Sequence, residues 1–243
     1  MLRLLLTALI LAVPAHAQDD RDAPYVPTPP STVEAMLDIA GVQPGERWLD
    51  LGSGDGRIAI AAARRGARAT GIERNPALVT RARYKAREAG VEARTRFRGE
   101  DLFTANVRDA DIVSLYLLPE MNLKLRPRLL AEMQPGARIV SHAFDMGDWR
   151  PDRFERDDER RIYLWIVPAV VGGEWRATLP GGEERPLVLT QRYQQVSGTL
   201  GGAALSDVTL RGAKLTFVAN GTRYVGTVDY GAIEGETGWR AIR

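Results

Sequence analysis

The stretch DLGSGDGR, residues 50–57, places three glycines between a short apolar run and an alanine-rich segment. Residues 46–51 (ERWLDL) predict a strand, and residues 56–66 (GRIAIAAARRG) predict a helix that ends at Gly66. A glycine-rich turn between a strand and a helix is a common way for α/β proteins to hold a nucleotide-containing ligand. The stretch therefore predicts an α/β fold with a ligand site at this turn.

The alternation of strands and helices continues on both sides of the turn. Ser31 or Thr32 is expected to cap a first helix that runs through residues 33–42. Because strands alternate with helices, we expect a mostly parallel sheet with helices on both faces. The further strands are expected at 68–73, 95–100, 111–118 and 137–144, and the further helices at 75–90 and 119–133, the last broken or bent near Pro127.

The pattern changes in the last third of the chain. Residues 152–161 are dense in charge and predict a solvated hairpin before a strand at 162–167. From Gly172 onward no helical period is visible, and short alternating runs are separated by glycine-rich turns. Asn220-Gly221 between two such runs indicates a two-residue hairpin turn. We expect a small antiparallel β domain at residues 171–243.

The first residues have the layout of a secretory signal peptide. An apolar run, Leu4 to Val13, follows Arg3 and precedes Pro14 and the small-residue triplet that ends at Ala17. We expect cleavage after Ala17 and an exported protein, periplasmic or secreted, of the bacterial envelope. The alternative is a retained anchor, but the run is shorter than the roughly 20 residues that a membrane span needs. The predicted segments are thus a leader (1–17), an extended arm (18–30), an α/β domain (31–170) and the β domain (171–243).

Composition sets further bounds. The chain has 243 residues, a net charge of +2 and no cysteine. The near balance of charge gives no indication of a nucleic-acid partner. The lack of cysteine excludes disulfides and thiolate metal sites, and no metal site is predicted. One predicted helix carries several basic residues, for which a solvated basic face is the default interpretation: Arg81, Arg83, Lys85 and Arg87.

The spacing of the glycines separates two kinds of cofactor. A dinucleotide turn requires G-x-G-x-x-G, whereas here Arg57 stands where the third glycine would be. The glycines are Gly52, Gly54 and Gly56, and Asp50 precedes them by two residues. This G-x-G-x-G turn with its acid resembles the first motif of the Rossmann-like methyltransferases that use S-adenosylmethionine. The resemblance implies a seven-stranded methyltransferase sheet and S-adenosyl-L-methionine as cofactor.

Six positions then acquire expected roles in binding that cofactor: the three glycines, Asp50, Glu73 and Asp101. Glycines let the backbone approach the methionine part closely, and Asp50 is placed to interact with the ammonium group. Glu73, at the end of the second strand, can accept hydrogen bonds from both ribose hydroxyls. Asp101, at the end of the third strand, is expected to reach the adenine amino group.

Several segments narrow the resemblance to the family that contains the mitochondrial ATP synthase c-subunit lysine methyltransferase and its prokaryotic relatives. These are DLGSGDGRI, Glu73 with Asn75-Pro76, a Pro-x-Met element at 119–121, and Phe144 followed by Trp149-x-Pro. The resemblance covers residues 25–167, and it implies a protein amino group, lysine first, as methyl acceptor. A small-molecule acceptor stays open. A second class of function is also open, a non-catalytic envelope binding module, because the methyl donor is made in the cytoplasm and the leader directs the chain elsewhere.

Methyl transfer from a sulfonium requires mainly that an electron pair is placed on the axis of the leaving bond and that water is excluded. Candidate groups for guiding an amine acceptor are Tyr116, after the fourth strand, and His142, after the fifth. For both residues, structural packing is the alternative. Pro119, Glu120 and Asp145 lie in the same two loops, and the arm at 25–28 is either a lid over the cofactor or a plain linker.

Overall fold

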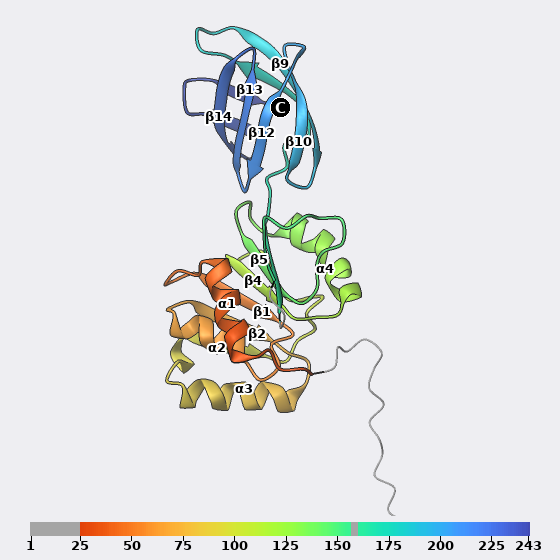
Figure 1. The fold of residues 1–243 in the computed structure, drawn as a ribbon. Helices are drawn as coiled ribbons and strands as arrows, with labels where there is room; N and C mark the ends of the chain where they lie inside the picture. The colour runs from red at the N-terminus through yellow and green to blue at the C-terminus, as the bar shows by residue number, and fades with distance from the viewer. Residues whose placement is uncertain (1–24, 157–159) are drawn as a thin grey trace, which may run out of the picture.

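The computed structural model describes residues 25–156 and 160–243, and in Figure 1 it shows an α/β part joined to a β part. The expected leader and cleavage point lie outside the described residues. Seven strands form the first sheet in the order β3-β2-β1-β4-β5-β7-β6, as predicted for a Rossmann-like methyltransferase sheet. Strands β1 to β5 are parallel, and β7 runs antiparallel to β5 and to β6. The strands are β1 (Arg47–Leu51), β2 (Arg68–Ile72), β3 (Thr95–Arg98), β4 (Ile112–Leu115), β5 (Arg138–His142), β6 (Arg153–Arg156) and β7 (Arg161–Ile166).

Helices cover both faces of this sheet, each with its own core. One core joins α1, α2 and α3 to residues such as Trp48 and Phe97 of the sheet. The other joins α4 to the opposite face, where Leu115 and Trp165 are fully buried. The helices are α1 (Pro30–Ala40), α2 (Arg57–Arg64), α3 (Pro76–Glu88), the short 3₁₀ helix η1 (Glu92–Arg94) and α4 (Pro119–Glu132).

Two details of the helices differ from the sequence-based expectation. Helix α1 begins at Pro30, and neither Ser31 nor Thr32 caps it, because the fixed φ of proline already suits the first helical position. Helix α4 is a single helix with Pro127 inside it, so of the predicted break or bend near this residue the break does not occur. Helix α3 is capped by Asn75, whose side chain accepts a hydrogen bond from the backbone of Ala77 at 2.9 Å.

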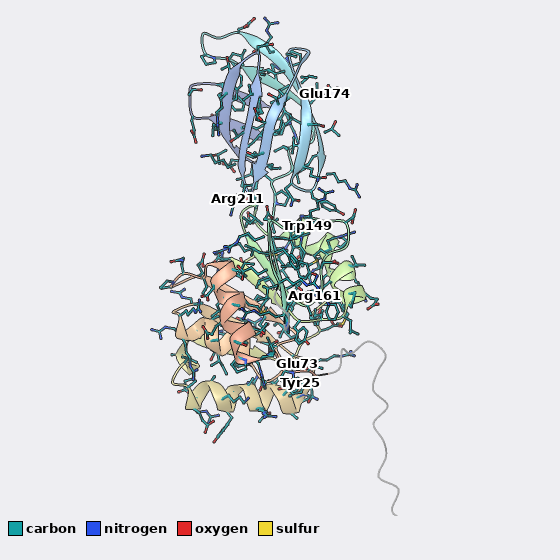
Figure 2. The ribbon with its side chains drawn as sticks, viewed as in Figure 1. Tyr25, Glu73, Trp149, Arg161, Glu174 and Arg211 are labelled. Carbon is teal, nitrogen blue, oxygen red and sulfur yellow. The ribbon has the colours of Figure 1, made fainter. Side chains whose placement is uncertain are left out.

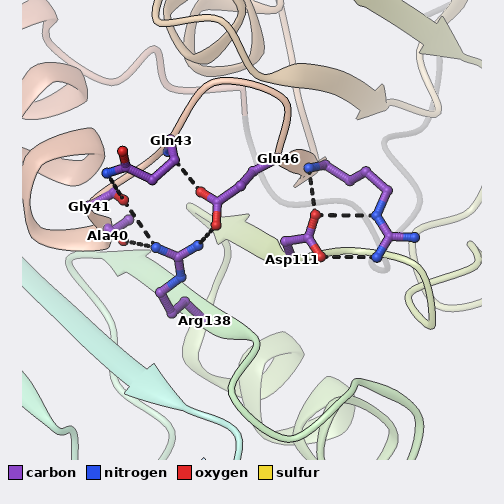
Figure 3. A network of polar contacts seen from close by, with 7 residues as sticks. Ala40, Gly41, Gln43, Glu46, Asp111 and Arg138 are labelled. Atoms are coloured by element: carbon purple, nitrogen blue, oxygen red, sulfur yellow. Dashed lines mark hydrogen bonds and ion pairs between the residues drawn. The ribbon is translucent and has the colours of Figure 1, made fainter.

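A polar network fixes the end of the sheet at which the parallel strands begin (Figure 3). The Arg138 guanidinium donates to the carbonyl of Ala40 at 2.7 Å and pairs with Glu46. Next to it, the Arg47 guanidinium forms two hydrogen bonds with Asp111, at 3.2 and 2.9 Å. These side chains tie the end of α1 to the first residues of β1 and β5 and hold the start of these parallel strands in place.

The second sheet contains nine strands and is antiparallel throughout, in the order β11-β10-β9-β8-β16-β15-β14-β13-β12. Its core contains Trp175, Phe217 and Trp239. Asn220 and Gly221 have positive φ values of 48° and 74° between paired strands, which confirms the predicted hairpin turn. The strands are β8 (Gly173–Thr178), β9 (Glu184–Arg192), β10 (Gln195–Leu200), β11 (Ala203–Ala204), β12 (Ser206–Arg211), β13 (Lys214–Ala219), β14 (Thr222–Asp229), β15 (Ala232–Gly235) and β16 (Arg240–Ile242).

The β part attaches beside the loop that follows β5. The indole Nε1 of buried Trp149 donates to Gln194 at 2.9 Å, and the Tyr193 ring stacks on the Trp149 ring with centroids 5.8 Å apart. Asp148 receives hydrogen bonds from Arg126 and Tyr193 and pairs with Arg192. In Figure 2, Trp149 lies on the side of the β part, whereas Glu73 and Tyr25 lie at the far end of the α/β part. No helix in the described part of the chain is long and apolar enough to cross a membrane.

Candidate cofactor and acceptor site

The glycine-rich turn after β1 is tight and held by the backbone. Gly52, Gly54 and Gly56 all have positive φ values, between 53° and 80°. The amides of Gly52 and Ser53 both donate to the carbonyl of Ile72 at 2.9 Å. A Cβ at Gly52 would come within 2.8 Å of Leu117, so a side chain at this position would crowd the floor of the turn. The turn therefore needs its glycines for conformation and for space.

Glu73 lies against this turn from the end of β2. Its Oε2 accepts the Gly54 amide at 2.9 Å, and its Oε1 accepts the Asn75 amide at 2.8 Å. Each oxygen of a carboxylate has a further lone pair, so both can accept another hydrogen bond. The two backbone amides hold the carboxylate in one orientation and leave a lone pair on each oxygen for a diol.

Asp50 is buried beneath the turn with one oxygen satisfied and the other without a partner. Its Oδ1 accepts the Ser114 hydroxyl at 2.6 Å, and the Ser114 oxygen accepts the indole N–H of Trp48 at 2.8 Å. Oδ2 has no partner among the described residues, and neither has the buried hydroxyl of Ser53. Burial raises the pKa of Asp50 to about 7. A buried carboxylate with a free oxygen is suited to a cationic group of a ligand.

A cavity of about 1010 Å³ opens beside these groups. Asp50, Glu73 and Asp101 line one side, and Tyr116 and Met121 line another. Such a volume is sufficient for a nucleoside-sized ligand and part of an acceptor. Asp101 is exposed, and its Oδ1 accepts the Phe103 amide at 2.8 Å, so it also holds the turn after β3. Within the described residues no cluster of His, Asp or Glu could hold a metal ion.

The N-terminal arm forms a wall of the same cavity. Residues 25–28 line it, and the Tyr25 ring lies over the turn, so that a Cβ at Gly54 would be 2.7 Å from Tyr25 Cε2. The Arg57 guanidinium donates to the Thr28 carbonyl at 2.7 Å and forms two 2.9 Å hydrogen bonds with Asp55.

Asp55 is buried and also pairs with Lys85 of α3. Although burial opposes ionisation, the Arg57 and Lys85 hydrogen bonds hold the pKa of Asp55 well below its usual range. Asp55 is therefore a carboxylate that anchors Arg57, and Arg57 anchors the arm. Sequence analysis used Arg57 only to exclude a dinucleotide motif; its role as the anchor was missed because its partner in the arm lies 29 residues away.

Tyr116 and His142 meet, but only Tyr116 faces the cavity. Their ring centroids are 4.0 Å apart, and Tyr116 lines the cavity while His142 is buried behind it. Burial, together with the charge of Arg161, lowers the pKa of His142 to about 4, so its imidazole is neutral near pH 7. Its Nδ1 has no partner among the described residues. The geometry thus gives the ring of Tyr116 direct access to a ligand, whereas His142 can act only through Tyr116.

The loop after β5 is held by Asn122, a residue that was not predicted from the sequence. Its amide nitrogen donates to the carbonyls of Phe144 and Asp145 at 3.3 and 3.2 Å. Asn122 comes directly after the Pro-x-Met element, at a fully buried position of α4. Asn122 is spaced from Leu125 and Leu129 as residues on one face of a helix are, so its place on the apolar face of α4 is a sequence signal that could have identified it.

The residues around the cavity fit S-adenosylmethionine. The free oxygen of Asp50 suits its ammonium group, the glycine turn lines the cavity beside Asp50 where its methionine part would lie, and Glu73 offers two oxygens to its ribose. When bound, this cofactor supplies an activated methyl group. The chain's own groups would orient it, while Tyr25, Tyr116 and Met121 line the same cavity and would exclude water from it.

Comparison with known sequences agrees with this fit. The family described as "ANTKMT methyltransferase domain" matches residues 50–153. A protein-lysine N-methyltransferase of Saccharolobus islandicus is 35% identical over 150 residues, which cover 59% of this chain and 93% of the relative. Mouse adenine nucleotide translocase lysine N-methyltransferase is 39% identical over 145 residues. The match covers 59% of this chain and 63% of the mouse protein, so the chain spans less than two thirds of that relative's length.

Among solved structures, one similar chain matches this protein over almost the whole of its own length. An RNA methyltransferase from Salinibacter ruber, crystallised with S-adenosyl-L-homocysteine, is 50% identical, with a TM-score of 0.59. The similarity covers 60% of this chain and 96% of the Salinibacter chain. All three relatives are named as methyltransferases, and their names differ in the acceptor, which is lysine in two of them and RNA in the third.

Proposed function

Because the chain belongs to the ANTKMT methyltransferase family of S-adenosylmethionine-dependent enzymes, we propose that it transfers a methyl group to a lysine side chain of a protein. The observation that carries the donor half of this proposal is the set of Asp50, Glu73 and the glycine turn around one cavity. The acceptor half is supported by the Saccharolobus relative, whose name specifies protein lysine and of which the chain covers 93%.

The lining of the cavity favours an amine acceptor with an aliphatic stem. Tyr116, Leu117 and Met121 present aromatic and apolar atoms next to the cofactor groups. An ammonium group that enters such surroundings loses solvation, which lowers its pKa and favours the free amine that attacks the methyl group. The neutral His142 behind Tyr116 adds no positive charge to oppose the approach of the acceptor ammonium.

The acceptor is tested by incubating the full chain with methyl-labelled S-adenosylmethionine and an envelope-protein extract. We expect label in one or a few protein bands, a mass gain of one to three methyl groups on lysine by tandem mass spectrometry, and no label with Glu73→Ala. The same reaction is run with total RNA and with the small-molecule fraction. Label that is confined to RNA or to small molecules would assign a different acceptor, and no label in any fraction would contradict the proposal.

We also propose that the chain acts in the bacterial envelope, which the layout of residues 1–17 supports. N-terminal sequencing of the protein from fractionated cells checks this. A mature chain that starts at Gln18 and is found outside the cytoplasm is the expected result. A full-length chain found in the cytoplasm, where S-adenosylmethionine is made, would contradict the export proposal.

A further inference from the structure

The small net charge of the chain conceals a strong local separation of charge. Residues 64–98 hold eleven basic and three acidic residues, whereas the whole chain carries a net charge of only +2. This segment forms the end of α2, β2, α3, η1 and β3, and β3 is the edge strand of the first sheet. Some of its charges are paired with acids outside the segment, as Arg65 is with Asp38 and Lys85 with Asp55. A separation of this size creates a local field that composition alone does not reveal.

Part of this charge surrounds a groove on the sheet face opposite to α2 and α3. Strand register places Leu49, Thr70 and Arg96 in one row across β1, β2 and β3, and Ile72 beside Arg98 in the next row. The groove has a volume of about 520 Å³. Its floor contains Leu49, Thr70 and Ile72, and Asn106 and Asp109 form the far wall.

Five arginines line the groove, and three of them have no partner. Arg47 pairs with Asp111 at 2.9 Å and lies 3.8 Å from Asp109, and Arg98 lies 3.6 Å from Glu100. The guanidinium groups of the other three are exposed and have neither hydrogen bonds nor ion pairs within residues 25–156 and 160–243; they belong to Arg68, Arg94 and Arg96. Like charges that are gathered without counter-charges favour an anionic partner.

The shape and lining of the groove select one kind of anion. Its floor is partly apolar and it is concave, so it suits side chains better than the flat surface of a bilayer does. Among its described lining residues the single aromatic one is Trp48, which is buried in the core of the opposite face and offers no stacking surface to a base. We propose that this groove binds an extended acidic segment of a polypeptide, with carboxylates on the partnerless arginines and apolar side chains on the floor.

Arginine is well suited to this role because its planar fork can bind a carboxylate through two hydrogen bonds. An extended segment places alternate side chains on opposite sides, about 6.6 Å apart along one side. Arg94 and Arg96 are also two residues apart, so a segment with alternating acidic and apolar residues matches the groove.

The groove adjoins the cofactor cavity, since Ile72 and Glu100 line both. A segment that lies in the groove would therefore lead toward the site of methyl transfer. We assign the segment to the acceptor protein itself, and this assignment rests on the proposed function. The binding of an acidic segment by the groove does not depend on it.

The test uses the full chain and a fluorescein-labelled peptide of six Glu-Val repeats, followed by fluorescence anisotropy. We expect saturable binding that weakens with added salt, and binding at least about tenfold weaker in Arg68→Glu/Arg96→Glu, since charge-assisted hydrogen bonds are lost. The matched control is Arg176→Glu/Arg223→Glu, which changes the net charge equally at exposed positions of β8 and β14 and should bind as the wild type does.

Three results would overturn the proposal: equal binding by both double variants, equal binding of a Lys-Val peptide, or tighter binding of polyuridylate or phosphatidylglycerol vesicles. The acceptor assignment has its own readout. With an identified acceptor protein, the groove variant should raise KM and leave kcat and the affinity for S-adenosylhomocysteine unchanged. If the groove variant lost peptide binding but kept an unchanged KM, the groove would still bind acidic segments, but the acceptor would not be the protein that supplies them. The proposed methyl transfer would not be affected by this result.

Discussion

Asp50 shows how a single buried carboxylate can make cofactor binding depend on pH. Its Oδ1 is fixed by the Ser114 hydroxyl, and its Oδ2 has no partner within the described chain. Burial raises its pKa to about 7, so much of this group is protonated at neutral pH when no cationic group lies beside it. A cationic ligand group next to Oδ2 would favour the carboxylate, because an opposite charge stabilises the ionised form.

Binding of S-adenosylmethionine should therefore weaken as the pH falls below about 7. The proton on Asp50 must leave before the ion pair forms, so affinity should drop by up to about tenfold per pH unit in that range. Titration calorimetry from pH 5.5 to 8.5 measures this, and Asp50→Asn should bind weakly with a flat profile. Ser114→Ala removes a hydrogen bond to the ionised form and should move the dependence to higher pH. A flat wild-type profile, or tighter binding at low pH, contradicts this role of Asp50.

The cofactor residues were accessible to sequence reasoning because they belong to one local motif and the next strand end. Gly52, Gly54, Asp50 and Glu73 all lie within 24 residues, and the structure places all four in the lining of one cavity. Ser114 and Trp48, which hold Asp50, could not be assigned in the same way. The Asp50–Ser114 contact joins residues 64 positions apart, and only the pairing of β1 with β4 brings them together.

At the scale of the element, the turn between β1 and α2 sets how closely the helix packs on the sheet. Gly56 precedes α2 with a φ of 80°, and a Cβ there would lie 2.7 Å from the Phe97 ring and 2.8 Å from Ala82. Glycine is therefore needed at position 56 for two reasons: the backbone conformation before α2, and the close packing of α2 with α3 and β3. Sequence analysis identified this glycine from the motif, but its contact with α3 follows only from the assembled layers.

Gly56→Ala should lower the free energy of unfolding by about 2–5 kcal/mol, from the left-handed backbone and from crowding. The matched control is Gly90→Ala, where φ is 68° but no atom lies within 4 Å of the added Cβ. That variant should lose about 1–2 kcal/mol from the backbone alone. Urea denaturation followed by circular dichroism measures both, and equal losses would show that packing at Gly56 is not limiting.

Element boundaries were predictable wherever hydrophobic periodicity and turn residues agreed, as in β2 and α3. The start of α1 was not, because Pro30 and the hydroxyl residues after it both signal a helix start and the backbone follows proline. Pro127 left a break or a bend open, and the break does not occur: α4 continues through it, with Leu125 and Leu129 buried on either side.

In the whole molecule, the β part is attached far from the cofactor cavity. It is held by the loop at 148–150, whereas the cofactor cavity lies at the opposite end of the sheet (Figure 2). Sequence analysis predicted that this β part exists but not where it attaches, because the contacts of Trp149 with Tyr193 and Gln194 join residues about 45 positions apart. Its position makes it a support for the loop after β5.

Gln194→Ala should therefore destabilise the protein and leave the cofactor site intact. Loss of the acceptor for the buried Trp149 indole costs about 1–3 kcal/mol. The neighbouring Gln195→Ala is the control, since Gln195 is exposed and its side chain has no recorded hydrogen bond in the described structure. Chemical denaturation gives the stabilities and calorimetry gives the affinity for S-adenosylhomocysteine. A similar loss in both variants, or a tenfold weaker affinity in Gln194→Ala, would disagree with this arrangement.

The most direct test of the account is the binding of S-adenosylmethionine to the full chain and to Glu73→Gln and Glu73→Ala, measured by isothermal titration calorimetry, with circular dichroism confirming that each variant is folded. We predict one site in the wild type and binding at least about 100-fold weaker in Glu73→Ala, because two charge-assisted hydrogen bonds to the ribose are lost. Glu73→Gln should fall between the two. Undiminished binding by folded Glu73→Ala, or no heat with wild-type protein at millimolar cofactor, would contradict the account.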